Sequence, residues 1–343
     1  MKQQFFFGLI ILLLLLLMPL FGLGGQLAQA FNALAQDTAE QGQLQTAPAN
    51  ELSPPSEKKA GSGGEVISVM RGGSGQIEEL QMDEYLLGVL AAEMSANSHE
   101  EALKAQAVAS FTYARYRTEI AGIEAISDSG TVEQEYISRE ERQRRWGGSF
   151  DLNEAKLQSA VAAVRGETVT YAGEPILAAF HAVSHGKTES AANYWGGTDH
   201  PYLQGIESPG DRLAPDYAKT VSFTPEEMKG ALQAAAKEKN YTFALDDGPV
   251  SWFEKPTRGE SGMVREIAVG GQALTGRALR EILDLRSADF TVDYDEKDAM
   301  FAVTTRGYGH SVGMSQYGAD FMARQGSGYK EILGHYYQGC EIK

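Results

Sequence analysis

The sequence predicts an α+β protein: mixed helices and short strands in one folded region, which lies behind an apolar N-terminal segment. Helical and strand patterns follow one another over residues 65–343 without the strict alternation of a parallel α/β sheet. Residues 26–64 are rich in Gln, Ala, Ser, Pro and Gly, and they hold too few large apolar side chains to fold. A length of 343 residues leaves room for two subdomains in the folded region.

The N-terminal segment decides the expected compartment. Residues 5–23 contain no polar side chain, and about 20 apolar residues are enough to cross a bilayer as a helix. Lys2 precedes this run, which favours a cytoplasmic N-terminus. We therefore expect a transmembrane anchor at 1–25, a flexible linker at 26–64 and an extracytoplasmic folded region at 65–343. A cleaved signal peptide is the alternative, because residues 28–30 (Ala-Gln-Ala) have the small-x-small form of a cleavage site.

The elements of the folded region follow from periodicity and turn residues. A capping pattern of Thr224, Pro225 and Glu227 predicts one helix start with particular clarity. Strands are expected at 65–70, 77–80 and 301–305, hairpins at 168–180 (168–171 with 176–180) and 264–274, and helices at 83–94, 99–117, 151–165, 314–325 and 328–337.

Charge and cysteine content exclude several classes of function. The formal charge is −16, which argues against binding to nucleic acid. The single cysteine, Cys340, cannot form an intrachain disulfide and excludes a cysteine-rich zinc site. His181 and His185 are four residues apart, but a strand pattern precedes them and Gly186 follows, so they are not expected to share a helix face. We predict no metal and no cofactor.

Glu93 is the residue whose position points to chemistry. Leu86, Val89 and Leu90 form the apolar stripe of the helix at 83–94, and Glu93 is the next member of that stripe. Burial raises the pKa of a carboxyl group, and the negative end of the helix dipole has the same effect. A carboxylic acid that stays protonated near neutral pH is what a general acid requires. The alternatives are a solvated Glu93 beyond an earlier helix end, or an ion pair with Lys104.

Ser98 and Glu101, three residues apart, predict a capping box at the start of the following helix, which is expected at 99–117. Lys104 and Gln106 are the strongly polar residues between Leu103 and the alanines that follow. From the pattern alone, both are expected to face solvent.

Several motifs, in order, now carry a resemblance to a known family. Residues 85–94 (YLLGVLAAEM) and 101–109 (EALKAQAVA) resemble the stage II sporulation protein D family. The same is true of 180–189 (FHAVSHGKTE) with 194–196 and 201–203, of 307–319 (GYGHSVGMSQYGA) and of 329–339 (YKEILGHYYQG). These matches are spread over the whole of 65–343, and together they are far more specific than any one of them.

The resemblance implies a membrane-anchored lytic transglycosylase that cleaves peptidoglycan glycan strands during engulfment in sporulation. It implies a preference for strands stripped of stem peptides, and 1,6-anhydro-muramyl ends in the product. The implied partners are a peptidoglycan amidase, stage II sporulation protein P, and a membrane scaffold, stage II sporulation protein M. In the family, the glutamate that matches Glu93 is the catalytic acid/base.

A lytic transglycosylase can work with one carboxyl group, whereas a hydrolase normally needs two. The muramyl substrate is anionic, so a cation has to offset the charge of this acidic protein, and Lys104 is the candidate nearest to Glu93 in sequence. Substrate contacts are expected from the second helix, from the third match and from the glycine-rich segment: Lys104, Gln106, Tyr113, Ser184, Glu189, His310, Ser315, Gln316 and Tyr317.

Two other functions stay open. Phe111 stands where the family usually has Arg, and a related branch modifies amidases, so a glycan-binding activator of an amidase without cleavage of its own is the main alternative. The third is a metal-dependent wall hydrolase built on His181 and His185.

Overall fold

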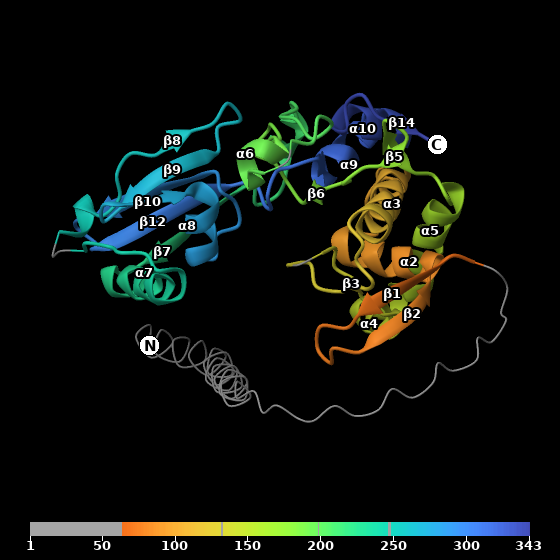
Figure 1. Ribbon diagram of the computed structural model, residues 1–343, viewed down its shortest axis with the longest axis horizontal. Coiled ribbons are helices and arrows are strands. Elements are labelled where there is room, and N and C mark those ends of the chain that lie inside the picture. The colour runs from red at the N-terminus through yellow and green to blue at the C-terminus, as the bar shows by residue number, and fades with distance from the viewer. Residues whose placement is uncertain (1–63, 132, 198, 246–247) are drawn as a thin grey trace, which may run out of the picture. The chain divides into compact units, whose positions relative to one another are not determined.

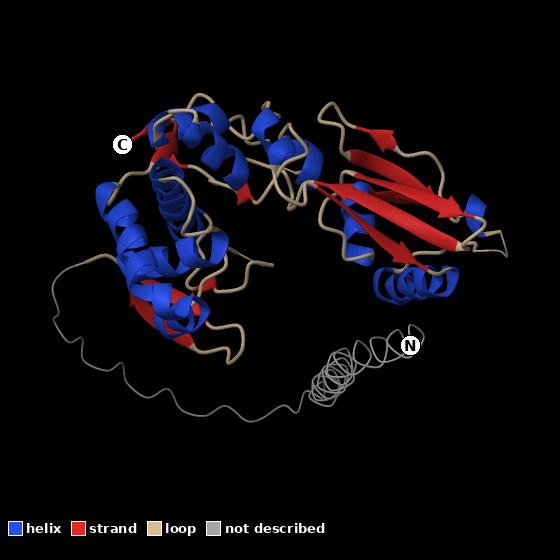
Figure 2. Ribbon diagram, turned by 180° about the vertical axis from the view of Figure 1, so that it is seen from behind, coloured by secondary structure: helices blue, strands red, loops and turns tan. Residues whose placement is uncertain are grey.

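The computed structural model describes residues 64–131, 133–197, 199–245 and 248–343, which belong to one compact unit, Ser62–Lys343. Within it the fold is mixed α+β, as predicted (Figures 1 and 2). The expected anchor at 1–25 lies outside the described residues, as does the linker up to residue 63. Among the helices of the described part, none is long and apolar enough to cross a membrane.

Two hydrophobic cores organise the described chain. The first core gathers the residues on either side of a long insertion. Its elements are β1 (Val66–Met70), β2 (Ile77–Gln81), α2 (Met82–Glu93), α3 (Glu100–Arg115), the π-helical turn Tyr116–Ile120, β3 (Ile126–Ser127), α4 (Arg139–Trp146), the 3₁₀ turn Gly147–Ser149, α5 (Phe150–Ala163), β4 (Val169–Tyr171), β5 (Glu174–Pro175), β6 (Phe180–His181), α6 (Ala191–Trp195), the 3₁₀ helix Pro209–Leu213, β13 (Met314–Ser315), α9 (Gln316–Arg324), α10 (Tyr329–Tyr336) and β14 (Glu341–Ile342).

The insertion forms the second core. It consists of β7 (Ala218–Phe223), α7 (Pro225–Lys239), the 3₁₀ turn Pro249–Ser251, β8 (Thr257–Arg258), β9 (Val264–Val269), β10 (Gln272–Thr275), α8 (Gly276–Ile282), β11 (Phe290–Asp295) and β12 (Met300–Arg306). Its strands form two sheets, in the orders β11-β12-β7 and β10-β9-β8. Helix α7 packs on β7 and β12, and α8 packs on β9 and β10 (Figure 2). A core of its own makes this insertion a subdomain.

Helix α3 is central to the first core. It contacts α2, α5, α9 and α10, and eleven of its sixteen residues are buried. Its alanines explain this, because small side chains let four neighbouring helices approach one helix closely. Helix α2 and the two C-terminal helices α9 and α10 therefore meet on α3, although more than 200 residues separate them in sequence (Figure 1).

Most elements agree with the sequence predictions. The strands at 66–70 and 77–81 pair in antiparallel fashion, the hairpin of β9 and β10 is present, and Thr224 forms the expected capping box.

Two local predictions were wrong. The N-cap of α3 is His99 rather than Ser98, because the His99 ring accepts a hydrogen bond from the Glu101 amide. The hairpin that begins at β4 has a shorter second strand than predicted: β4 pairs with β5 and the Ile176 amide donates to the Val169 carbonyl at 3.2 Å, but the pairing does not continue to residue 180. Phe180 and His181 instead pair in parallel with β13, a partner too distant in sequence for a turn pattern to reveal.

Candidate functional site

Helix α2 brings Glu93 into the protein, as its apolar stripe predicts. Val89 and Leu90 are fully buried and Glu93 is the last residue of the helix. Burial is the largest influence on the Glu93 carboxyl group and raises its pKa. The charge of Glu135 raises it further, whereas two hydrogen bonds lower it, and the net pKa lies above the usual value for glutamate.

Two distant segments hold the Glu93 carboxylate. Its Oε1 accepts a hydrogen bond from the Glu135 amide at 2.9 Å, and its Oε2 accepts one from Gln316 Nε2 at 3.2 Å. A carboxyl group held by two donors has a defined orientation, which is the geometry that proton transfer to a bound substrate needs. Glu93 lies on the inward-facing stripe of α2, as expected, and it is half-buried there. The alternative ion pair with Lys104 is not formed in the described structure.

Gly88 allows the first of these contacts. The segment that carries Glu135 crosses α2 at this glycine, and the Ile137 amide donates to the Gly88 carbonyl at 3.4 Å. A Cβ atom on Gly88 would lie 2.2 Å from the Tyr136 ring and 2.5 Å from the Ile137 carbonyl oxygen. The backbone can pass this close only because position 88 has no side chain.

Gln316 joins Glu93 to a buried polar chain. Its Nε2 also lies 3.4 Å from Gln106 Oε1, and Gln106 Nε2 donates to Ser110 Oγ at 3.0 Å. Gln106 is fully buried, so the expectation that it faces solvent was wrong. A buried amide needs partners, and α9 supplies one that is 210 residues away in the sequence.

A buried aspartate, Asp211, fixes the start of α9. Ser315 is the N-cap of this helix and donates to Asp211 Oδ1 at 2.8 Å, while the Ser184 amide donates to Oδ2 at 2.9 Å. The Ser184 hydroxyl also donates to Oδ2. Burial raises the pKa of Asp211 against the effect of these hydrogen bonds. Ser184 and Ser315 are therefore interior residues that position Gln316, rather than residues at the surface.

The other predicted site residues lie in separate environments. Lys104 pairs with Glu100 and Glu101, both on its own helix. Tyr113 donates to Glu133, and Tyr317 donates to the Leu213 carbonyl at 3.0 Å. Glu189 is buried, and it accepts hydrogen bonds from Ser190, Asn193 and Ser261.

His310 lies among aromatic rings. Its ring centroid is 5.2 Å from that of Trp195 and 5.7 Å from that of His181. Burial, and then the charge of Arg280, lower the pKa of His310 to about 4. The imidazole is therefore neutral at physiological pH and can act there as a hydrogen-bonding group, not as a cation.

His181 and His185 do not form a pair. His181 Nδ1 contacts the Val312 carbonyl and His185 Nε2 contacts the Ser261 carbonyl. In the part of the chain that the structure describes, no three His, Cys, Asp or Glu side chains come together as metal ligands.

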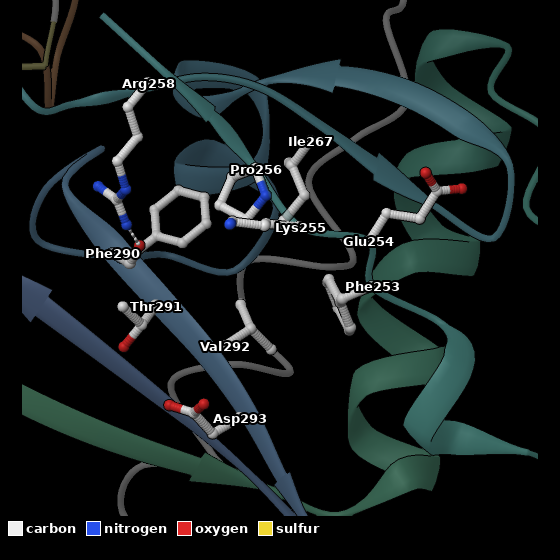
Figure 3. Close-up of a pocket in the computed structure, with 10 residues that line it drawn as sticks. All are labelled: Phe253, Glu254, Lys255, Pro256, Arg258, Ile267, Phe290, Thr291, Val292 and Asp293. Carbon is white, nitrogen blue, oxygen red and sulfur yellow. Dashed lines mark hydrogen bonds between the residues drawn. The ribbon is translucent and has the colours of Figure 1, made fainter.

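A separate pocket lies elsewhere, in the second subdomain. It has a volume of about 490 Å³ and lies between residues 253–256 and β11, with Phe290 and Arg258 at one end (Figure 3). Arg258 donates to the Phe290 carbonyl there, at 2.6 Å. This pocket contains none of the predicted site residues, so the pocket and the chemistry around Glu93 are separate features.

Sequence reasoning missed three contributors to the Glu93 site: Gly88, Glu135 and Asp211. Gly88 stands inside a quoted motif, and a helix-interior glycine is a signal of close backbone approach. Glu135 holds Glu93 through its amide, for which no residue type is diagnostic. Asp211 lies in the short 3₁₀ helix Pro209–Leu213 and carried no local signal.

The fold and the site define a class: an α+β protein with a half-buried glutamate at a helix end, held in part by a glycine-rich motif more than 200 residues further along the chain. Comparison with known proteins gives the family. A family model described as stage II sporulation protein matches residues 70–171. The chain is 37% identical to stage II sporulation protein D of Bacillus subtilis (strain 168), over 80% of this chain and 78% of that protein. It is 36% identical to stage II sporulation protein D of Bacillus amyloliquefaciens, over the same shares.

The chain therefore belongs to the stage II sporulation protein D family, a family of sporulation proteins. A more distant relative is the amidase enhancer of Bacillus subtilis (strain 168), 25% identical over 75% of this chain and 40% of that protein.

Proposed function

We propose that this protein is a peptidoglycan lytic transglycosylase in which Glu93 is the catalytic acid and base. The observation that supports this most strongly is the half-buried Glu93 carboxyl group, with its raised pKa and its two hydrogen bonds from distant segments. A protonated carboxyl group at a defined position suits the first step of glycosidic cleavage.

The reaction uses one carboxyl group twice. Protonated Glu93 gives its proton to the glycosidic oxygen as the bond to the muramyl C1 breaks. The muramyl C6 hydroxyl oxygen then bonds to C1, and its proton returns to the Glu93 carboxylate. The product carries a 1,6-anhydro ring and no added water. Gln316 and the Glu135 amide stabilise the carboxylate that forms between the two proton transfers.

The predicted substrate-binding residues fall into two groups, those in the buried polar chain behind Gln316 and those outside it. Gln106 and Ser315 act through Gln316, and Ser184 acts through Asp211. We propose direct glycan contacts for the residues outside that buried chain: Lys104, Tyr113, Glu189, His310 and Tyr317.

The cellular setting is also proposed. The apolar run in residues 1–25 is the anchor to the cell membrane, 26–64 is the linker, and 65–343 acts outside the cytoplasm on glycan strands stripped of stem peptides. An amidase that removes those peptides, stage II sporulation protein P, and the scaffold stage II sporulation protein M are the proposed partners during engulfment.

The deciding experiment compares the protein with its Glu93→Gln variant on peptide-free glycan strands. We expect anhydro ends from the wild type and a loss of cleavage of at least about a thousandfold in the variant, because the amide cannot supply the proton. Mass spectrometry of the products measures both. Asp83→Asn, at the exposed start of the same helix, is the matched control and should cleave normally.

Reaction products other than anhydro ends would identify a different activity. Ends heavier by one water would identify a hydrolase, with a second catalytic group still to be found.

The second candidate function, activation of an amidase, is supported by the amidase-enhancer relative and by Phe111, which is buried in the first core. Glycan binding without cleavage, together with amidase stimulation that Glu93→Gln retains, would favour that function.

A further inference from the structure

An exposed aromatic surface lies beside the glycine-rich motif, in addition to the residues around Glu93. Trp195 is 37% exposed and Tyr308 is 50% exposed, which is unusual for such large side chains. The Trp195 ring packs beside His310 and, with a centroid distance of 6.0 Å, beside Tyr194. Trp195 therefore belongs to a ring cluster with Tyr194 and His310, and Tyr308 is the exposed ring two residues before His310 in the chain.

Two arginines border this surface. Arg280 Nη1 donates to the Tyr194 hydroxyl at 2.8 Å, and Arg280 Nε donates to the Leu285 carbonyl at 3.0 Å. The Arg286 guanidinium lies 4.6 Å from the centre of the Tyr308 ring, and its Nη1 donates to the Asp216 carbonyl at 3.0 Å. Both side chains are thus held in place by neutral groups.

Neither guanidinium has a carboxylate partner among the described residues, although most arginines of this acidic chain do. Arg277, one turn before Arg280 on α8, pairs with Glu281 at 2.9 Å. A positioned guanidinium whose charge is not neutralised is suited to a carboxylate from outside, because its fork of N–H groups matches the two carboxylate oxygens.

Backbone contacts place the two arginines and the rings in one neighbourhood. The Leu285 carbonyl accepts from Arg280, and the next carbonyl, that of Arg286, accepts from the Gly309 amide at 2.9 Å. Gly309 separates Tyr308 from His310. The field is positive here, since the charge of Arg280 contributes to the lowered pKa of His310. His310 is neutral, so the arginines carry the charge.

We propose that Arg280 and Arg286, together with the rings of Trp195 and Tyr308, form a subsite for a carboxylate-bearing sugar, with the lactyl carboxylate of a muramyl residue as its ligand. The inference rests on the proposed function for the identity of the glycan. The two arginines supply the counter-charge for the lactyl group in addition to the glycan contact proposed for Lys104, whose own charge is paired with Glu100 and Glu101. Gln316 follows His310 by six residues, so their Cα atoms are at most about 21 Å apart, within reach of one short oligosaccharide.

The test measures binding in the full-length protein with Glu93→Gln as background, so that cleavage does not affect the result. The two probes are peptide-free muramyl glycan strands and neutral chitin oligosaccharides of equal length, which lack the lactyl group. We expect tighter binding of the muramyl strands. Combined Arg280→Gln and Arg286→Gln should weaken that binding about tenfold or more and change chitin binding less than about twofold. Higher salt should reduce the preference.

Three further variants separate charge from structure. Arg265→Gln, at an exposed position on β9 of the same subdomain, is the matched control and should bind both glycans as the background does. Arg280→Lys with Arg286→Lys keeps the charges and should recover part of the preference. Trp195→Ala should weaken both glycans alike, because a ring contact does not depend on the lactyl group.

Equal affinity of the background protein for the two probes would overturn the proposal. So would an equal loss for both probes in the Gln pair. The outcome is independent of the transglycosylase proposal: a protein that binds in this way but never cleaves would support the subsite and count against the enzyme.

Discussion

At the scale of single residues, Glu93 shows opposing influences on one carboxyl group. Burial favours the protonated form, and the hydrogen bonds from Glu135 and Gln316 favour the carboxylate. Burial is the larger influence, so the pKa is raised. A general acid benefits from this balance, because it must be protonated before cleavage and stable as a carboxylate after it.

This balance predicts a shift in the pH profile of glycan cleavage. Activity falls as the pH rises through the pKa of Glu93, because the acid is then lost. Gln316→Ala removes a bond that stabilises the carboxylate, so it should raise the pKa of Glu93 and move the alkaline limb to higher pH. Cleavage rates measured across pH test this. Gln325→Ala, at the exposed end of α9, is the control and should leave the limb in place.

An alkaline limb that stays in place, or moves to lower pH, in Gln316→Ala would show that another group controls the pH profile.

The tenfold or larger loss of glycan binding predicted for the Arg280 and Arg286 variants also belongs to this scale, because it depends on two guanidinium groups and not on the fold around them.

At the scale of elements, the site depends on how closely one segment crosses α2. The Glu135 amide reaches Glu93 only because Gly88 lets residues 136 and 137 pass against the helix. The start of α9 is fixed in a comparable way by its N-cap, Ser315, and the buried carboxylate of Asp211. Each of these two elements places one hydrogen-bond donor on Glu93.

Substitution of Gly88 tests the first of these crossings. Gly88→Ala should lower the free energy of unfolding by about 1–3 kcal/mol and reduce cleavage, because the new methyl group displaces the segment that carries Glu135. Chemical denaturation and the cleavage assay measure the two effects. Gly334→Ala, on α10, is a matched helical control: its Cβ meets no atom within 4 Å, and it should stabilise by about 0.5–1 kcal/mol.

If Gly88→Ala were as stable and active as the wild type, the close crossing would not be what positions Glu135.

At the scale of the whole molecule, the insertion between β7 and β12 has its own core. Phe301 lies near its centre, 1% exposed, with its ring centroid 5.5 Å from that of Trp252 and 4.8 Å from that of Tyr294. Contacts such as that of Arg280 with Tyr194 join this subdomain to the first. The aromatic surface beside the glycine-rich motif therefore depends on both subdomains.

Truncation of this core has a predictable cost. Phe301→Ala should lower the free energy of unfolding of the second subdomain by about 3–5 kcal/mol, because it leaves a cavity among aromatic rings. Denaturant titration followed by tryptophan fluorescence measures this. Val221→Ala, at a partly exposed position on the neighbouring strand, is the control and should change stability by less than about 0.5 kcal/mol. A loss below about 1 kcal/mol in Phe301→Ala would contradict a separate second core.

Local patterns were sufficient for most elements, because helices and hairpins are stabilised by residues near in sequence. The Thr224 capping box, the hairpin of β9 and β10 and the buried face of α2 are examples. The same patterns indicated that Glu93 is buried. They failed at His99, where the ring of an unexpected residue caps α3, and at β6, whose partner strand is far away in the chain.

The surroundings of Glu93 could not be predicted in this way. Its two donors are 42 and 223 residues away, and the partner of Gln106 is 210 residues away. The same holds for Lys104, which pairs with two carboxylates of its own helix, and for Arg280 and Arg286, which have no carboxylate partner within the described part of the chain. Periodicity reports which face of a helix is buried, because burial acts on each residue through its own polarity. The partners that a buried group finds depend on how distant segments pack, and packing is a property of the folded chain.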